Sequence, residues 1–326
     1  MLQKGEQLSH SWLKRHSAQV AAYSGILVCI VFFSILTPLY GESIWAPARL
    51  ETLMRNVIVL ALMSVGAVFV YALGSMDISI GKQMGLYATL TVVIGNQTGT
   101  LLWGILLSIV IALIIGAING ATGELLHIHP VISSLVFMMI LSGVSSITYN
   151  SLGSRNVALS GIDFSIFKQT WFMVLILAIE VAVVGYLFNF TRLGKNARAI
   201  GANPLAAQQS GVNLVRYKIF AYLIMGICIV IASLFQMGYT GSASDSTGTG
   251  FEMNVMVALI LGGMPLSGGM KSKVSCALVG SFTYALLAVG LPMIGVQANQ
   301  VFVIKAALFL VVVLLTCRKK IGTLPR

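Results

Sequence analysis

The sequence predicts an all-α polytopic membrane protein, and three properties support this assignment. Only 9% of the 326 residues are charged, whereas 57% are hydrophobic and the mean hydropathy is +0.94. An ordinary soluble domain has about a quarter of its residues charged, and it could not bury this much apolar surface. The apolar residues are also grouped in runs long enough for membrane-spanning helices, which need about 20 residues each.

The apolar runs predict about ten transmembrane helices. Ten helices of about 20 residues would take about 200 residues and leave the rest for loops and tails. No soluble domain interrupts the pattern, so residues 1–326 are predicted to form a single transmembrane domain. The predicted spans are residues 19–39, 53–73, 78–94, 101–123, 131–149, 171–190, 217–237, 253–266, 274–291 and 301–317.

The distribution of Lys and Arg predicts that both termini are cytoplasmic, because short loops rich in these residues tend to stay in the cytoplasm. With a cytoplasmic N-terminus, fifteen Lys and Arg residues, Lys82 among them, fall inside and four fall outside. The tails 1–17 and 318–326 and the loop 191–216 are then cytoplasmic. The net charge of +11 is spread over short loops, so nucleic acid is not expected as a partner. The four residues predicted outside are Arg49, Arg55, Arg155 and Lys168.

A short motif recurs weakly in the two halves of the chain. Residues 74–81 read Gly-Ser-Met-Asp-Ile-Ser-Ile-Gly and residues 262–269 read Gly-Gly-Met-Pro-Leu-Ser-Gly-Gly, and each copy interrupts an apolar run. Helix breaks at membrane depth are found where protein or a water-filled cavity satisfies the backbone, and paired breaks are typical of a transport pathway. The alternative is that these glycines allow close helix packing. The pathway interpretation selects Gly74, Asp77, Ser79, Gly81, Gly262, Gly263, Ser267 and Gly269.

Motifs of ATP hydrolysis and of common enzymes do not occur in the sequence. It contains no G-x-x-x-x-G-K-[ST] phosphate loop, no H-E-x-x-H and no G-x-S-x-G. His127 and His129 have no carboxylate or thiol partner in register, so no metal site is predicted. The chain is therefore not expected to be an enzyme, and any ATP-driven motor would be another protein.

An ion-coupled secondary transporter is the main alternative from another class. Such transporters usually carry several ionisable groups at membrane depth. Here the candidates are Asp77 at the first break, Glu180 midway along its run and Lys305 in the last run. We expect structural roles for Glu180 and Lys305, which disfavours ion coupling without excluding it.

The loop 191–216 is predicted to contain a short docking helix. Asn203 is a suitable N-cap, Pro204 suits the first helical position and Gly211 suits a C-terminal stop. A helix of about seven residues is not stable alone in water, so it must dock on this protein or on a partner.

Several motifs, in a matching order along the chain, resemble permease subunits of bacterial ATP-binding-cassette (ABC) importers, in particular the ribose/xylose-type permeases. That branch also includes branched-chain amino acid and nucleoside permeases. The segment Ala206-Ala207-x-x-x-Gly211 is similar to the A-A-x-x-x-G core of their cytoplasmic coupling loop. Residues 74–81 resemble G-G-I-D-L-S-V-G, residues 191–194 resemble T-R-x-G, residues 248–253 resemble G-T-G-Y-E-L and residues 261–269 resemble L-G-G-x-x-L-x-G-G. The resemblance covers residues 50–315.

The resemblance implies a pore-forming subunit of the bacterial cytoplasmic (inner) membrane that pairs with a second permease copy, itself or a similar chain. It implies an extracytoplasmic solute-binding protein and a cytoplasmic ABC ATPase, often a fused tandem protein, as further partners. ATP and Mg would be bound by the ATPase, and no cofactor by this chain. The residues expected to couple to the ATPase are Gly201, Asn203, Pro204, Leu205, Ala206, Ala207 and Gly211.

Departures from the family pattern leave the solute open. Ser75 replaces a glycine, Pro204 stands where sugar permeases often have an acidic residue, and Asn254 replaces an aspartate. Little pathway charge fits a monosaccharide such as ribose, but a nucleoside, a signalling sugar derivative or a hexofuranose fits equally well. Glu252 and Asn254 are predicted to offer hydrogen-bonding groups at the outer mouth. A local role for Glu252 in the first turn of a helix is the alternative.

Overall fold

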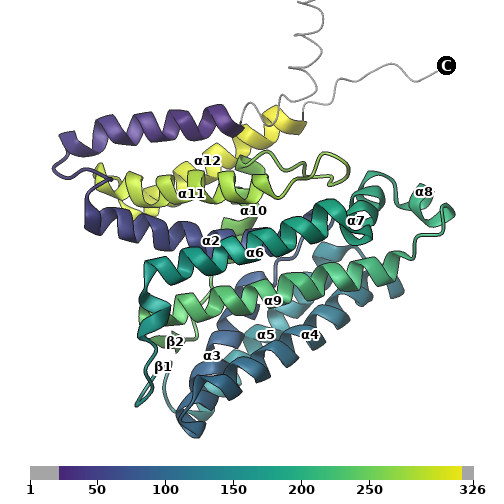
Figure 1. Cartoon of the computed structure of the whole chain (residues 1–326), viewed down its shortest axis with the longest axis horizontal. Helices are drawn as coiled ribbons and strands as arrows, with labels where there is room; N and C mark the ends of the chain where they lie inside the picture. Colours follow the sequence, from purple (N-terminus) through teal and green to yellow (C-terminus); the bar gives the residue numbers. More distant parts are fainter. Residues whose placement is uncertain (1–21, 318–326) are drawn as a thin grey trace, which may run out of the picture.

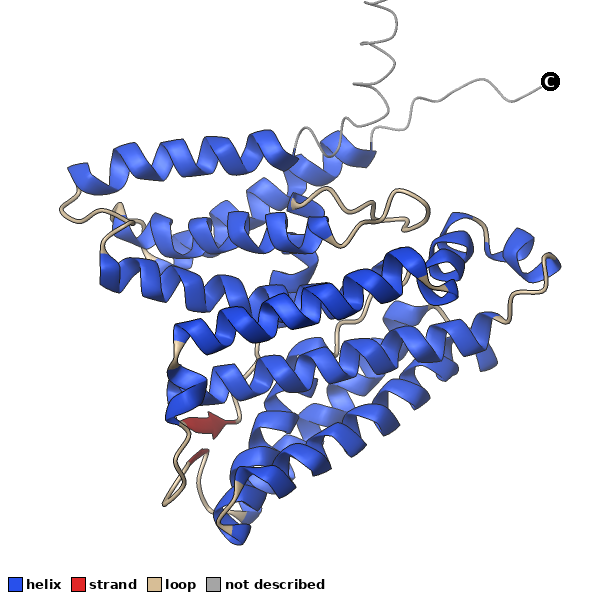
Figure 2. Cartoon of the chain, viewed as in Figure 1, coloured by secondary structure: helices blue, strands red, loops and turns tan. Residues whose placement is uncertain are grey.

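The computed structural model describes residues 22–317, and Figure 2 shows that helices dominate this part of the chain. Each predicted span overlaps a helix, and the predicted tails 1–17 and 318–326 lie outside the described residues. The helices are Ala22–Leu39, α2 (Pro47–Ala72), α3 (Ile80–Thr98), α4 (Leu101–Leu125), α5 (Pro130–Ser151), α6 (Thr170–Phe190), α7 (Arg192–Ala202), α8 (Pro204–Gln209), α9 (Leu214–Thr240), α10 (Phe251–Leu261), α11 (Ser275–Met293) and α12 (Ala298–Cys317). A 3₁₀ helix, η1 (Ser165–Lys168), precedes α6.

Local sequence explains several helix boundaries. α2 and α5 begin with proline, where a missing N–H costs nothing. Asn213 caps α9, since its side chain accepts a hydrogen bond from the Arg216 amide at 3.0 Å. α3 and α9 end at Gly99 and Gly241, whose φ angles of 74° and 68° are in the left-handed region that favours glycine.

α2 is the central helix of the bundle. Its residues 57–72 are all buried, and it contacts α6, α7, α9, α10 and α11. A helix that is apolar all round is stable only when it is enclosed in this way or by lipid. Figure 1 shows helix Ala22–Leu39, α11 and α12 on one flank of α2, with α9, α4, α5 and α3 on the other.

The two ends of the bundle differ. α7 and α8 lie at one end, which we call the coupling end. At the opposite end, the strand end, β1 (Asn156–Ala158) pairs antiparallel with β2 (Ser242–Ser244), with Val157 opposite Ala243 (Figure 1). The two strands join the loop after α5 to the loop after α9, so they hold the two connections together.

Seven of the described helices are long and apolar enough to cross a membrane: Ala22–Leu39, α2, α4, α5, α6, α9 and α11. The chain is therefore a multi-pass membrane protein, but the predicted count of ten is not confirmed. α10 has 11 residues and rises only about 17 Å, against a hydrocarbon core of about 30 Å. The apolar run 253–266 ends as a helix at Leu261, because a break begins at Gly262 and Gly263.

The segment between β2 and α10 enters the bundle rather than staying at its end. Gly81 and Gly85 lie one turn apart on α3 and leave room for this segment. A Cβ atom at either position would lie closer than van der Waals contact to a carbonyl oxygen of Thr247 or Gly248. α10 therefore starts inside the bundle, packed against the beginning of α3, which explains how so short a helix can continue a membrane crossing.

Within residues 22–317, the loop cations that were predicted on opposite sides of the membrane lie at opposite ends of the bundle, except at Lys82. Arg55 donates a hydrogen bond to the Lys168 carbonyl at 2.7 Å, and both lie with Arg155 at the strand end, opposite the loop 191–216. Lys82 was predicted to be cytoplasmic, but its ammonium group donates to the Asp245 carbonyl at 3.4 Å. It thus faces the segment that enters from the strand end, because residues 73–79 form a break inside the bundle and not an external loop. Which end is cytoplasmic stays a prediction.

Candidate translocation site

The predicted docking helix forms at the coupling end. The Asn203 side chain accepts a hydrogen bond from the Ala206 amide at 3.1 Å, and α8 follows with Pro204 at its first position. Gly211, with a φ angle of 83°, ends the segment. The sequence therefore predicted this helix and its two boundaries correctly.

The two coupling candidates in the middle of α8 face opposite ways. Leu205 is 71% exposed and projects a large apolar side chain from the coupling end, whereas Ala207 is only 6% exposed. Ala207 therefore seats α8 on its own chain, where it joins the main hydrophobic core. Pro204, Ala206 and Gly211 are exposed like Leu205, so they form the part of α8 that a partner can reach.

α7, which the sequence did not predict as a helix of its own, ends against both glycine-rich breaks. The Gly269 amide donates to the Ala72 carbonyl at the end of α2 at 2.9 Å. A Cβ atom at Gly201 would lie closer than van der Waals contact to that same carbonyl oxygen and 2.7 Å from the Gly269 nitrogen. A Cβ atom at Gly74 would lie 3.0 Å from the Ser267 carbonyl oxygen. We call Ala72, Gly74, Gly201, Ser267 and Gly269 the break junction.

The two breaks match in sequence but differ in conformation. Gly74 has a φ angle of 74°, whereas the corresponding Gly262 has a φ angle of −74° at the end of α10. Gly81 lies inside α3, whereas the corresponding Gly269 lies in a loop with a φ angle of 87°. Ser267 is exposed. These glycines serve close approach of backbones, so the packing interpretation explains their geometry.

Asp77, predicted to line the pathway, is buried in a polar network between α3, α4 and α5. One carboxylate oxygen accepts hydrogen bonds from the Ser79 amide at 2.7 Å and hydroxyl at 2.5 Å. The other accepts from the Gln83 side chain at 3.2 Å and from the Asn119 side chain at 3.1 Å. Ser133 of α5 donates in turn to the Asn119 oxygen at 3.2 Å. Asp77 and Ser79 therefore hold the first break in place through this network.

Glu252 is half-buried and contacts its own backbone and the start of α3. One carboxylate oxygen accepts a hydrogen bond from the Gly250 amide at 3.1 Å, just before α10. The other lies where a Cβ atom of Gly81 would be, so the carboxylate packs on the start of α3. The contact with Gly250 agrees with the local role in the first turn of the helix, and the role at an outer mouth stays a prediction.

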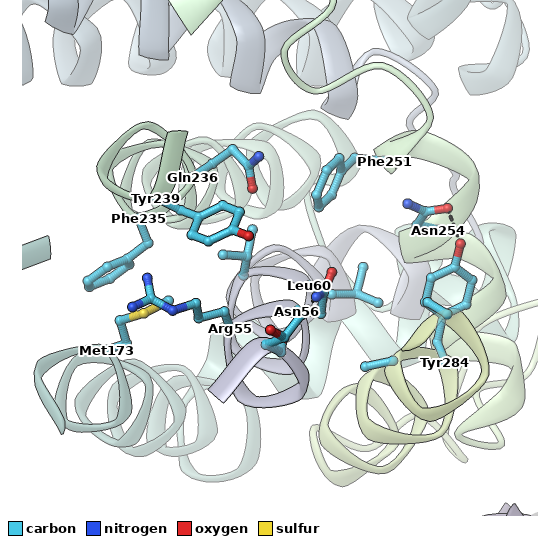
Figure 3. Close-up of a pocket in the computed structure, with 14 residues that line it drawn as sticks. Arg55, Asn56, Leu60, Met173, Phe235, Gln236, Tyr239, Phe251, Asn254 and Tyr284 are labelled. Carbon is cyan, nitrogen blue, oxygen red and sulfur yellow. Dashed lines mark hydrogen bonds between the residues drawn. The ribbon is translucent and has the colours of Figure 1, made fainter. Parts of the chain in front are cut away.

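A pocket of about 180 Å³ opens between α2, α6, α9, α10 and α11, and Asn254 is the predicted site residue that lines it (Figure 3). It is large enough for several water molecules. Aromatic rings provide much of its wall: Phe235 and Tyr239 of α9, Phe251 of α10 and Tyr284 of α11. The residues with polar groups that line it are Thr52, Arg55, Asn56, Gln236, Tyr239, Asn254 and Tyr284.

The charged group of this pocket is already paired. The Arg55 side chain forms an ion pair with Glu51 at 2.5 Å, and its guanidinium lies over the Tyr239 ring, 5.3 Å from the ring centroid. Planar guanidinium groups stack well on aromatic faces. The pocket therefore offers amides, hydroxyls and aromatic faces together with a neutralised cation.

Most of the residues that line this pocket were not predicted. Arg55, Gln236 and Tyr284 lie inside apolar runs, where a polar side chain is costly and often functional. That signal is present in the sequence, but it does not tell which helices bring such residues together.

Glu180 is buried in α6 beside Cys228 of α9, and its carboxylate has no oxygen or nitrogen partner among residues 22–317. Met173, seven residues before Glu180 on α6, lines the pocket, but Glu180 itself does not. The structure thus does not join Glu180, Asp77 and Lys305 into one polar path.

Comparisons with known proteins identify the family. The model of the family described as "Branched-chain amino acid transport system / permease component" matches residues 49–313. The ribose import permease protein of Escherichia coli K12 is 26% identical over 321 residues, which cover 95% of this chain and 96% of that protein. The ribose import permease protein of Bacillus subtilis 168 is also 26% identical, over 97% of this chain and 99% of that protein.

A galactose/methyl galactoside import permease protein, from Haemophilus influenzae, is 29% identical over 258 residues, 73% of this chain and 76% of that protein. The predicted resemblance to ABC importer permeases is thereby confirmed, as is a multi-pass location in the bacterial cytoplasmic membrane. The matched region covers most of the chain, from α2 to α12, and the chain belongs to the branched-chain amino acid transport system permease component family.

Proposed function

We propose that this chain is the membrane-spanning subunit of an ABC importer, and that it passes a monosaccharide through the pocket described above. Relatives matched over most of its length include import permeases for ribose, and one matched over 73% of this chain is an import permease for galactose or methyl galactoside. ATP hydrolysis is assigned to a separate cytoplasmic ATPase that binds ATP and Mg. A solute-binding protein and a second permease copy complete the proposed transporter.

The chemistry of the pocket carries this proposal. A sugar leaving water loses hydrogen bonds, and each one left unpaired costs about 1–3 kcal/mol. The three amides Asn56, Gln236 and Asn254 can replace those bonds, and aromatic rings can pack on the apolar face of a sugar ring. The volume is below the range of about 300–1,000 Å³ for pockets that hold drug-sized ligands, which suits a small solute.

An amino acid is a poorer fit, although the family description names branched-chain amino acid transport. A zwitterion would need a partner for its ammonium group, and no Asp or Glu lines the pocket as the structure describes it. Arg55, the group suited to a carboxylate, is paired with Glu51. A neutral polyhydroxy solute needs neither charge.

The break junction supports coupling to ATP hydrolysis. α8 presents Leu205 at the coupling end, and α7 joins α8 to the junction through Gly201. A displacement of α8 by the ATPase would therefore reach the end of α2 and the second break through backbone contacts. Interfaces packed this closely tend to shift between discrete arrangements and do not deform gradually.

Reconstitution tests the proposal. Proteoliposomes containing the permease, its ATPase and its binding protein should accumulate ribose or galactose when ATP is supplied, and permease alone should not respond to a proton or sodium gradient. Uptake driven by such a gradient without the ATPase would support the ion-coupled alternative instead. Accumulation of nucleosides and not of either sugar would keep the transporter class and replace the solute.

A matched pair of variants locates the solute. Gln236→Leu removes one amide from the pocket and should lower sugar uptake about tenfold. Gln97→Leu makes the same change on the exposed last turn of α3 and should leave uptake unchanged. Equal uptake by both variants, at equal abundance, would place the sugar elsewhere.

A further inference from the structure

Lys305 carries a cation into the hydrophobic helix α12, and its ammonium group reaches the pocket wall from behind. It donates a hydrogen bond to the Tyr284 hydroxyl at 2.9 Å and lies 4.3 Å from the centroid of that ring. Tyr284 in turn donates to the side-chain oxygen of Asn254. No carboxylate pairs with Lys305 in the part of the chain that the structure describes. A cation at this depth is costly and is usually kept for a function.

Lys305 sets the direction of both hydrogen bonds in the series Lys305–Tyr284–Asn254. An ammonium group can only donate, so the Tyr284 oxygen accepts from Lys305 and its hydroxyl hydrogen is available for Asn254. The Asn254 oxygen is thereby occupied, and its amide nitrogen must point the other way. Figure 3 shows this nitrogen directed away from Tyr284, into the pocket. It has no acceptor among the described residues.

We infer that Lys305 and Tyr284 are positioning residues that fix the Asn254 amide as a hydrogen-bond donor to one oxygen of the transported solute. This inference rests on the proposed function, since it concerns how the same pocket selects its solute. The selectivity follows from the fixed direction of the amide. A hydroxyl oxygen on the solute accepts the bond, a fluorine accepts it weakly and a hydrogen atom does not accept it.

The test compares sugars that differ in one oxygen. In proteoliposomes holding the complete transporter, uptake of ribose and of galactose is compared with uptake of their singly deoxygenated and singly fluorinated forms. The same binding protein delivers every probe, so its own preference cancels when a variant is divided by the wild type. At one position, the wild type should prefer hydroxyl to hydrogen by about threefold to tenfold, with fluorine between them.

Removing the Tyr284 hydroxyl, which links Lys305 to Asn254, should abolish that preference. Tyr284→Phe keeps the ring but frees the Asn254 amide to turn. Sugars with a hydroxyl and with a hydrogen at that one position should then be taken up equally, and the preferences at other positions should not change. Lys305→Met should have the same effect, and Lys305→Arg should restore the preference because it still donates. Tyr186→Phe removes a hydroxyl from an exposed ring stacked on Phe190 and should behave as the wild type.

Each outcome decides between the two proposals. A wild type that takes up neither sugar overturns the proposed function. If the wild type takes up sugar and the Tyr284→Phe and Lys305→Met variants keep its full preference, the proposed function stands and the positioning role is overturned. A uniform loss for every probe, at normal abundance, also overturns it, because it indicates a role in transport and not in selection.

Discussion

Asp77 shows how a single buried charge can be held without a cation. It is 1% exposed, and the partners of its two oxygens are the Ser79 amide and hydroxyl and the Gln83 and Asn119 amides. Buried carboxylates need such compensation, because desolvation otherwise makes the charged form too costly. The network ties the first break to α4, so we interpret Asp77 as a residue that sets the shape of the break.

The first prediction concerns this network. Asp77→Asn would bring an amide NH₂ group against donors, so at least one donor would lose its acceptor, and we expect a loss of about 1–3 kcal/mol in the free energy of unfolding. Thermal unfolding in detergent would measure it. Asp163→Asn is the matched control, since Asp163 is in an exposed loop where the backbone amide of Ser165 lowers its pKa, and the asparagine oxygen can still accept that bond. Equal melting of Asp77→Asn and wild type would contradict the structural role.

Single residues were the least predictable part of the site. The sequence singled out Asn254 and the acidic pair Asp77 and Glu252, and of these three Asn254 lines the pocket. Asp77 and Glu252 instead satisfy nearby backbone and amide groups. Whether a polar side chain turns to a cavity or to its own backbone depends on contacts tens of residues away, such as that of Asp77 with Asn119.

Among the elements, the coupling segment connects two parts of the chain that are distant in sequence. Gly201 of α7 contacts both the end of α2 and the second break. Replacing Gly201 with alanine would place a methyl group inside the Ala72 carbonyl, so the backbones must separate. We expect Gly201→Ala to lose at least half of its coupled transport while the uncoupled ATPase activity persists, measured as sugar imported per ATP hydrolysed.

The control for this second prediction is Gly185→Ala. Gly185 lies in α6 with nothing within 4 Å of its hypothetical Cβ atom, so alanine fits and improves helix propensity. Coupled transport by Gly185→Ala should match the wild type. A Gly201→Ala variant with unchanged transport per ATP would show that the contact is not part of the coupling route.

A third prediction concerns the docking face of α8. Leu205→Asp puts a charge on the exposed apolar side chain and should abolish ATPase binding without lowering membrane abundance, measured by co-purification of the ATPase. Leu126→Asp makes the same change at another exposed leucine, just after α4. We expect little effect there. A charged residue at Ala207 is a weaker test, because that side chain is buried and α8 itself would be displaced.

Helices were predicted well, and their lengths and connections less well. The caps at Asn203 and Gly211 and the apolar run of α2 are local signals, so they could be read directly. The end of α10 was missed because glycine and leucine kept the run 253–266 apolar past the helix. The three-residue strands were missed because β1 and β2 are some 80 positions apart, and each is too short to show alternation.

At the scale of the whole molecule, the two ends of the bundle separate the proposed tasks. The paired strands and α8 lie at opposite ends of the bundle (Figure 1). The pocket includes Arg55, which bonds to Lys168 at the strand end, whereas the break junction contacts the end of α7 beside α8. Most Lys and Arg residues of the loops lie with α7 and α8, which supports a cytoplasmic coupling end. This bias predicts the orientation, with the coupling end in the cytoplasm.

A fourth prediction tests the orientation by labelling. In a variant without the native cysteines, Ser210→Cys after α8 should react with a membrane-impermeant thiol reagent only in inside-out vesicles. Ser160→Cys, after β1, should react only from outside intact cells. Both residues are exposed, so access to the reagent depends on the side of the membrane. Labelling of the two from one side would contradict the assigned orientation.

The glycine contacts between helices also bear on how this family can change over evolutionary time. At Gly104 and Gly280, an added methyl group would meet a neighbouring backbone carbonyl, as it would at Gly85, whereas Gly25 and Gly143 have open space. Lineages can therefore exchange Gly25 and Gly143 freely, but a change at Gly85, Gly104 or Gly280 requires the facing helix or segment to move at the same time. In an alignment of relatives, positions 85, 104 and 280 should stay glycine while the solute changes, and positions 25 and 143 should vary even among permeases for one sugar.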